Sequence, residues 1–77
     1  MQVKMNEWYC CHFPIRNCFE LCKVMKRLIK GPDTRLRYEY FIITFYDRKE
    51  VFSGSRKDCF SFIENNWVER RYLDAKH

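Results

Sequence analysis

The strongest hydrophobic pattern in the chain runs from Leu36 to Tyr46 and predicts a β-strand, because β-branched and aromatic residues dominate it. Successive side chains of a strand point to opposite faces of the sheet. One face of this strand carries Phe41, Ile43 and Phe45. The opposite face is mainly tyrosine and carries Tyr38, Tyr40, Ile42, Thr44 and Tyr46.

The residues that follow predict a hairpin built from strands 36–46 and 50–53. Residues 47–50 are polar and favour a turn between the two strands. Pairing across this turn sets Phe45 opposite Phe52 and Thr44 opposite Ser53. The two phenylalanines then share a face, which favours this register.

Residues 17–30 predict an amphipathic helix. Asn17 is a good N-cap, Glu20 stands at the capping-box position, and Gly31 followed by proline is a stop signal. At about 100° per residue, the hydrophobic side chains fall on one arc and the opposite arc is basic, with Phe19 as the exception within it. The hydrophobic arc contains Cys18, Leu21, Cys22, Val24, Met25, Leu28 and Ile29.

A second helix is predicted over residues 55–71, with Ser55 as N-cap and Asp58 at the capping-box position. Residues 1–13 include a short hydrophobic and aromatic run that we interpret as an edge strand. Pro14 ends this run, since proline cannot donate to a sheet ladder.

Together these elements predict a single α+β domain over residues 1–77 in the order (β)αββα. We expect an antiparallel sheet of two or three strands, with both helices packed on its phenylalanine face. The tyrosine face would then stay open as an interaction surface, unless the N-terminal segment folds over it or it is simply a solvated face. The residues proposed for protein interaction are Phe19, Tyr38, Tyr40, Ile42 and Tyr46.

The chain is basic, with 15 Lys and Arg against 10 Asp and Glu and a formal charge of +5. This favours an anionic partner, either nucleic acid or an acidic protein surface, although a merely solubilising surface has the same composition. The residues proposed for anion binding are Lys23, Lys26, Arg27 and Lys30 on the first helix, Arg35 and Arg37 before the hairpin, Arg48 and Lys49 at its turn, and Arg56 and Lys57 at the last helix.

One short segment resembles a known family. Gly54-Ser55-Arg56-Lys57-Asp58 is similar to the basic helix start of double-stranded-RNA-binding domains. The resemblance covers these residues only, and two predicted strands rather than three separate the helices. It therefore transfers no RNA-contact residue to this chain.

Catalytic and metal sites are not expected. The two histidines, His12 and His77, do not combine with a cysteine and an acid into a nucleophilic constellation, and two glycines cannot build a phosphate loop. The five cysteines lack paired zinc knuckles, so we interpret them as reduced, buried thiols of a cytoplasmic protein. We expect no cofactor, and no hydrophobic run is long enough to span a bilayer.

These patterns favour a non-catalytic binding module that engages nucleic acid or a nucleoprotein assembly through its basic surface. The alternative is a protein-interaction module, such as a small regulator, adaptor or inhibitor of a kind that viruses encode, docking through the aromatic sheet face. A homodimer through the sheet edge or the open face is a further alternative.

Overall fold

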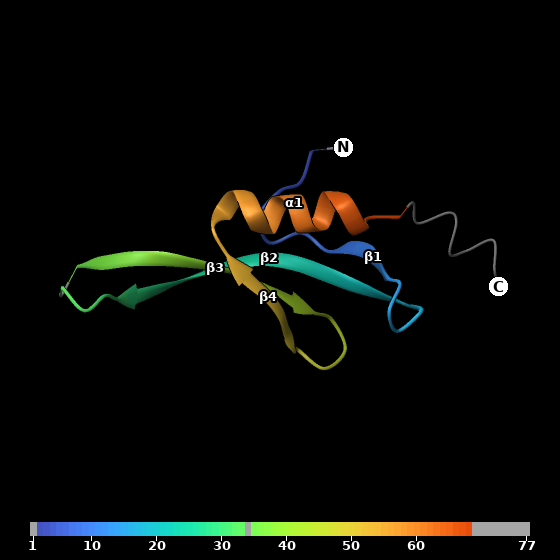
Figure 1. The fold of residues 1–77 in the computed structure, drawn as a ribbon, viewed down its shortest axis with the longest axis horizontal. Helices are drawn as coiled ribbons and strands as arrows, with labels where there is room; N and C mark the ends of the chain where they lie inside the picture. The colour runs from blue at the N-terminus through green and yellow to red at the C-terminus, as the bar shows by residue number, and fades with distance from the viewer. Residues whose placement is uncertain (1, 34, 69–77) are drawn as a thin grey trace.

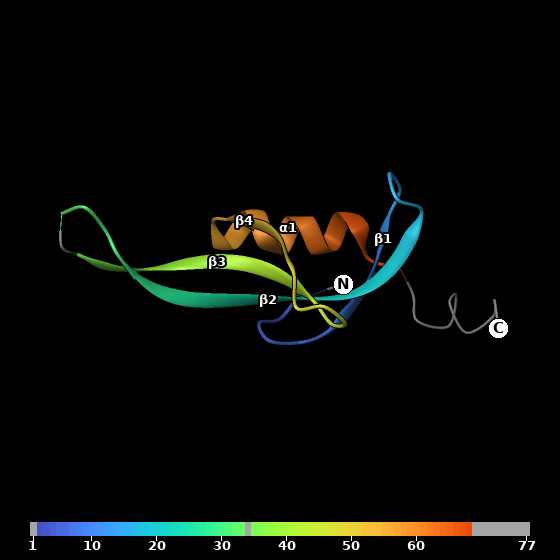
Figure 2. The ribbon, with the colours of Figure 1, turned by 90° about the horizontal axis from the view of Figure 1, so that it is seen from below.

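The computed structural model describes residues 2–33 and 35–68. Four antiparallel strands follow one another in the sheet in chain order: β1 (Tyr9–Phe13), β2 (Cys18–Lys30), β3 (Leu36–Thr44) and β4 (Glu50–Gly54). One helix, α1 (Arg56–Asn66), follows β4 and lies across the sheet (Figure 1). Seen from below, α1 lies on one side of the sheet only (Figure 2). The predicted (β)αββα fold with two helices is therefore wrong.

The predicted helix over residues 17–30 is the central strand β2. Its residues pair with β1 on one side and with β3 on the other, for example Tyr9 with Cys22 and Val24 with Ile42. A central strand has hydrophobic side chains on both faces, so its pattern also fits a helical arc. The predicted caps are turn residues: Asn17 lies between β1 and β2 with φ 48°, and the amide of Gly31 donates to Arg35 in the β2–β3 turn.

The hairpin of β3 and β4 exists, but its register differs from the prediction. Phe52 pairs with Ile42, three positions from the predicted Phe45, because the turn is longer than the pattern indicated. The register then shifts between Ile42 and Ile43, where β4 contains an additional residue, Val51. A shift by an odd number of residues exchanges the faces of a strand, so Phe52 joins the face of Ile42.

The two faces of β3 are consequently the reverse of the prediction. Ile42 and Thr44 are fully buried beneath α1, whereas Phe41 and Ile43 lie half-buried on the opposite face. The tyrosine face of β3 is therefore the core side over the middle of the sheet.

Helix α1 begins where the sequence predicts. Ser55 is its N-cap and accepts a hydrogen bond from the amide of Asp58 at 3.0 Å. The helix ends at Asn66, earlier than predicted, because Trp67 has an extended backbone and pairs with Cys11 in an isolated bridge; the rest of the predicted extension, residues 69–71, lies outside the described residues. Cys59 and Ile63 face the sheet and are fully buried.

The hydrophobic core lies between α1 and the middle of the sheet. The predicted N-terminal edge strand is confirmed over Tyr9–Phe13, at the outer side of β2. Val3, from the segment before this strand, also contributes to the core, and the amide of Asn6 donates to the carbonyl of Val24. The fully buried side chains are Cys11, Cys22, Val24, Ile42, Thr44, Cys59 and Ile63.

Strands β2 and β3 continue beyond this core as a two-stranded arm, which we define as residues 26–40. The last β4 pair joins Gly54 to Tyr40, and four further β2–β3 pairs extend from Arg27–Glu39 to Lys30–Leu36. Figure 1 shows the arm projecting beyond α1, and the molecule measures 51 × 24 × 19 Å.

Candidate nucleic-acid interface

The fold distributes the ten predicted cationic residues over four places. Four of them, Lys26, Lys30, Arg35 and Arg37, are exposed on the arm. Arg56 and Lys57 begin α1, directly after the strand that pairs at the base of the arm. Lys23, Arg48 and Lys49 belong to the other end of the sheet, around the β3–β4 turn, and Arg27 lies in ion pairs at the base of the arm.

Arg27 is committed to neighbours within the protein. Its guanidinium lies 3.0 Å from a carboxylate oxygen of Glu39 on β3 and 3.0 Å from one of Glu50 on β4. The hydrogen bond to Glu39 raises the pKa of Arg27, with a further contribution from Glu50. The guanidinium also lies 4.3 Å from the centre of the Phe41 ring. Arg27 therefore joins the arm to the body and has little charge left for a partner.

The other cations of the arm are much less engaged. Among the described residues, the structure records no ion pair for Lys30 or Arg37. Arg35 approaches Asp33 only to 3.7 Å, and both side chains are largely exposed. Lys26 lies 4.4 Å from the centre of the Tyr38 ring, a cation–π contact that leaves its charge uncompensated.

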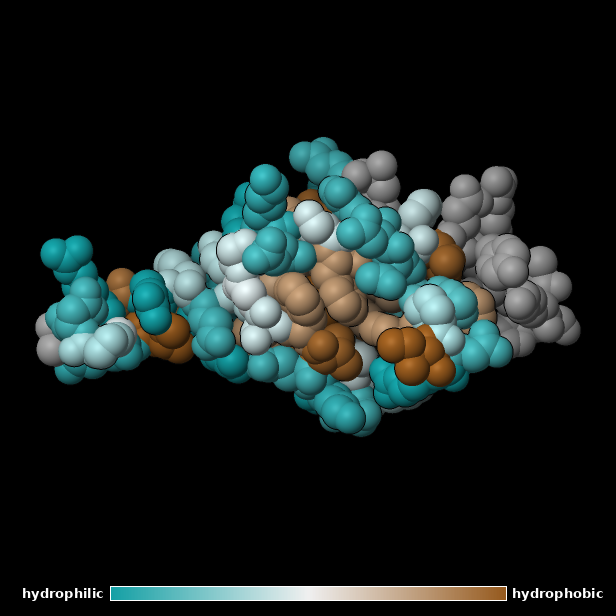
Figure 3. Space-filling model, viewed as in Figure 1, coloured by the Kyte–Doolittle hydropathy of each residue, from teal (hydrophilic) through white to brown (hydrophobic). Residues whose placement is uncertain are grey.

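Positive charge is concentrated on the arm. Residues 26–40 carry five cations and two carboxylates, a net charge of +3 against +5 for the whole chain. This charge surrounds three exposed hydrophobic side chains on the face that continues the core side of the sheet. Leu28 is 55% exposed, Leu36 64% and Tyr38 54%. Figure 3 shows the arm as a mainly hydrophilic surface with hydrophobic atoms between the polar ones.

The five residues predicted for protein interaction do not form one surface. Ile42 is fully buried, so its predicted role at an open face is wrong, and Tyr40 is half-buried against the core. Tyr38 lies on the arm, whereas Tyr46 follows β3 at the opposite end and is 83% exposed. Phe19 lies at the start of β2, with its ring 4.8 Å from that of His12.

The sheet face opposite α1 carries an aromatic and cationic cluster that the sequence pattern did not predict. Trp8 packs edge-on against Phe45 with ring centres 5.1 Å apart. Lys23 lies 4.5 Å from the Trp8 ring centre, and Arg48 lies 5.2 Å from the rings of both aromatic residues. Trp8 is separated from Phe45 by 36 residues of sequence that include two turns, so only the fold reveals this proximity.

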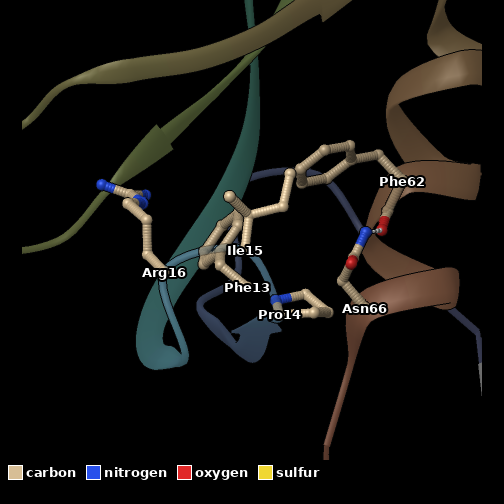
Figure 4. Close-up of a pocket in the computed structure, with 6 residues that line it drawn as sticks. All are labelled: Phe13, Pro14, Ile15, Arg16, Phe62 and Asn66. Atoms are coloured by element: carbon tan, nitrogen blue, oxygen red, sulfur yellow. Dashed lines mark hydrogen bonds between the residues drawn. The ribbon is translucent and has the colours of Figure 1, made fainter.

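A hydrophobic pocket of about 380 Å³ lies where the β1–β2 turn meets the end of α1. In Figure 4 the side chains of Phe13, Ile15 and Phe62 converge on it, whereas Arg16 extends away. Arg16 is paired with Glu20 at 3.0 Å, and the amide of Asn66 donates to the carbonyl of Phe62. The pocket thus offers hydrophobic contacts and few free polar groups.

The cysteines contribute to packing. Burial raises the pKa values of Cys10 and Cys59, and a hydrogen bond with Cys11 together with burial raises that of Cys22. Buried thiols with raised pKa values are poor nucleophiles at neutral pH. Within residues 2–33 and 35–68, no group of three or more His, Cys, Asp and Glu side chains is arranged to hold a metal ion.

Comparison of the chain with protein-family models, curated proteins and solved structures finds no match. In the part of the chain that the structure describes, no helix is long and hydrophobic enough to cross a membrane. The surface of the molecule is therefore the guide to its function.

Proposed function

We propose that this chain is a non-catalytic binding module that engages nucleic acid through its exposed cations. The observation that carries the proposal is the concentration of uncompensated positive charge on a projecting part of the sheet. Lys30 and Arg37 have no ion-pair partner among the described residues. Arg35 lies near the carboxylate of Asp33, but its side chain remains largely exposed. Such cations neutralise phosphates and release condensed counterions, which gives sequence-independent affinity.

The test is the binding of fluorescent, random-sequence oligonucleotides by the purified full chain as a function of salt. Four phosphate contacts predict a slope of log K against log salt of about −3.5 on a duplex, since each contact contributes about −0.9. A flat salt dependence, or no binding at 50 mM salt to duplex or single strand, contradicts the proposal.

The second candidate is a protein-docking module, and it is supported by the uncovered sheet face around Trp8 and Phe45. Aromatic residues with neighbouring cations are enriched in the centres of protein interfaces. In this case a partner captured from lysate survives nuclease treatment and is lost in Tyr46→Ala, whose side chain is 83% exposed. Loss of every captured partner on nuclease treatment contradicts this candidate.

A further inference from the structure

The arm is a narrow, two-stranded element that projects from the sheet, and its shape limits what it can bind. Lys26 and Tyr40 face each other where the arm leaves the sheet. Four further residue pairs of β2 and β3 lie beyond them, so the arm extends about 14 Å before its turn. In the described structure neither β1 nor β4 pairs along this part. The major groove of B-form DNA is about 12 Å wide and 8.5 Å deep and admits a two-stranded ribbon.

The chemistry of the arm fits that groove. Lys30 and Arg37 are exposed near its outer end, where phosphates line both sides of a groove. Leu28 and Leu36 project on one face between the cations. Hydrophobic side chains can contact the thymine methyl group in the major groove, and arginine can bind a guanine edge in a bidentate manner.

The base of the arm extends the same positive surface. Arg56 and Lys57 begin α1 two and three residues after Gly54, the last residue of β4 to pair with β3. These cations stand where a duplex that holds the arm would pass the body of the protein. They can contact the flanking phosphate backbone without reading any base.

Other occupants fit less well. A second copy of this chain would bring two arms of charge +3 together, which is unfavourable. Single strands are bound in basic grooves with aromatic platforms, whereas the aromatic residue that lines the hollow at the base of the arm, Tyr38, already has its ring in contact with Lys26. The major groove of an RNA duplex is too narrow for side chains to read.

We infer that the β2–β3 arm enters the major groove of double-stranded DNA, with Lys30 and Arg37 on the phosphates and Leu28 and Leu36 on the base edges. This inference rests on the proposed nucleic-acid function and adds the substrate class and the element that recognises it. Binding should combine a large salt-dependent contribution with a smaller hydrophobic one.

The first experiment measures binding of a 20-base-pair DNA duplex by fluorescence anisotropy. The double variant Lys30→Gln/Arg37→Gln should bind at least about tenfold more weakly, with the salt slope reduced by about 2. The matched control, Arg48→Gln/Lys49→Gln, removes the same charge at the other end of the sheet and should change affinity less than about threefold. Circular dichroism and thermal unfolding verify that both variants are folded.

The hydrophobic contribution is tested separately. Leu28→Ser/Leu36→Ser changes exposed side chains, so the fold should persist while affinity falls several-fold at an unchanged salt slope. An unchanged affinity would show that the leucines do not touch DNA and would overturn their assigned role.

The groove is tested with two modified probes. In a duplex with glucosylated hydroxymethylcytosine the sugar groups fill the major groove, so the chain should no longer bind through its arm. Netropsin fills the minor groove and should not compete with the chain for DNA. Competition by netropsin, or equal binding of the glucosylated duplex, overturns the groove assignment. Preference for an RNA duplex or a single strand overturns the substrate class.

The outcomes separate the two proposals. If the wild-type chain binds no nucleic acid, the proposed function fails and the inference fails with it. If it binds DNA but the arm variant and the turn variant lose the same affinity, the function stands and the arm is not the site.

Discussion

Strand β2 passes through two environments, and the contrast between them separates stability from function in this molecule. From Cys22 to Val24 it pairs with β3 beneath α1, and the side chains of Cys22 and Val24 are fully buried. From Leu28 to Lys30 it pairs only with β3, and the side chains of Leu28 and Lys30 are exposed. The buried part holds the fold together by hydrophobic packing, whereas the exposed part contributes little to it and carries charge that we propose binds nucleic acid.

The largest effect is a loss of stability, expected when one side chain is shortened in the buried region but not when a side chain on the same sheet face is shortened in the arm. Ile42→Ala removes a fully buried side chain and should lower the free energy of unfolding by about 2–5 kcal/mol. Leu28→Ala, on the same face of the arm, should cost less than about 1 kcal/mol. Urea unfolding followed by circular dichroism compares the two.

A variant that does not fold would leave this comparison open at Ile42, so Ile42→Val provides the milder step of about 0.5–1.5 kcal/mol. If Leu28→Ala is as costly as Ile42→Ala, the arm is part of the cooperative core and the distinction between the two regions is wrong.

The next effect concerns α1, which packs on the middle of the sheet and not on the arm. Ser55→Ala removes the side chain that caps α1 through the amide of Asp58 and should cost about 1 kcal/mol. Ser53→Ala, an exposed change on β4, is the matched control and should stay within about 0.5 kcal/mol. The DNA affinity of Ser55→Ala should fall less than that of the Lys30→Gln/Arg37→Gln variant, because losing the cap loosens only the first turn of α1, with Arg56 and Lys57, and leaves the arm in place.

The parts that the sequence predicted correctly are those with a local signal. The strand from Leu36 to Thr44 has a continuous run of strand-forming residues, and Ser55 with Asp58 marks the start of α1. The edge strand Tyr9–Phe13 was also recognisable, because Pro14 marks its end.

The parts that failed depend on distant contacts. Residues 18–30 fit a helical period as well as a strand, and only pairing with β1 and β3 decides between them. The register of β4 depends on a turn in which Arg48 has φ 54° and on the extra residue Val51, neither of which the pattern reveals.

The sequence names the cations of the candidate site but not their arrangement. Lys26, Lys30, Arg35 and Arg37 were identified as cations for a partner, yet the sequence assigned the first two to a helix. Placing them on one arm with Leu28 required the β2–β3 pairing, because this pairing aligns residues on either side of the turn.

A smaller effect, on the pH dependence of stability, is expected at the β3–β4 turn, at the opposite end of β3 from the arm. The Thr44 hydroxyl donates to the Asp47 carboxylate, and this hydrogen bond, supported by the Lys49 amide, lowers the pKa of Asp47. A lowered pKa contributes stability that is complete above the unfolded value of about 4 and is lost as the pH falls through the lower folded value. The thermal midpoint of the wild type should therefore fall more steeply below pH 4 than that of Asp47→Asn.

Thr44→Val is the control for this prediction, because it removes the donor while keeping the shape of the side chain. In that background the change Asp47→Asn should leave the pH profile nearly unaltered. An undiminished pH effect would assign the lowered pKa to the turn backbone instead of the threonine.

The smallest effect is expected where the two regions meet. Arg27 contacts Glu39 and Glu50 at the base of the arm, and all three side chains are partly exposed, so solvent and salt weaken the ion pairs. Arg27→Gln should leave the thermal midpoint almost unchanged, while the backbone amides of Ile29 and Arg37, which face each other in the β2–β3 ladder, exchange with solvent up to about fivefold faster. Hydrogen exchange measured by NMR detects this local change.

In 1 M salt the wild-type exchange rates should approach those of the variant, because screening removes the same contacts. Equal acceleration at the amide of Lys23, which faces Ile43 in the part of the ladder beneath α1, would mean that the arm and the rest of the sheet open together and that Arg27 does not mark a boundary between them.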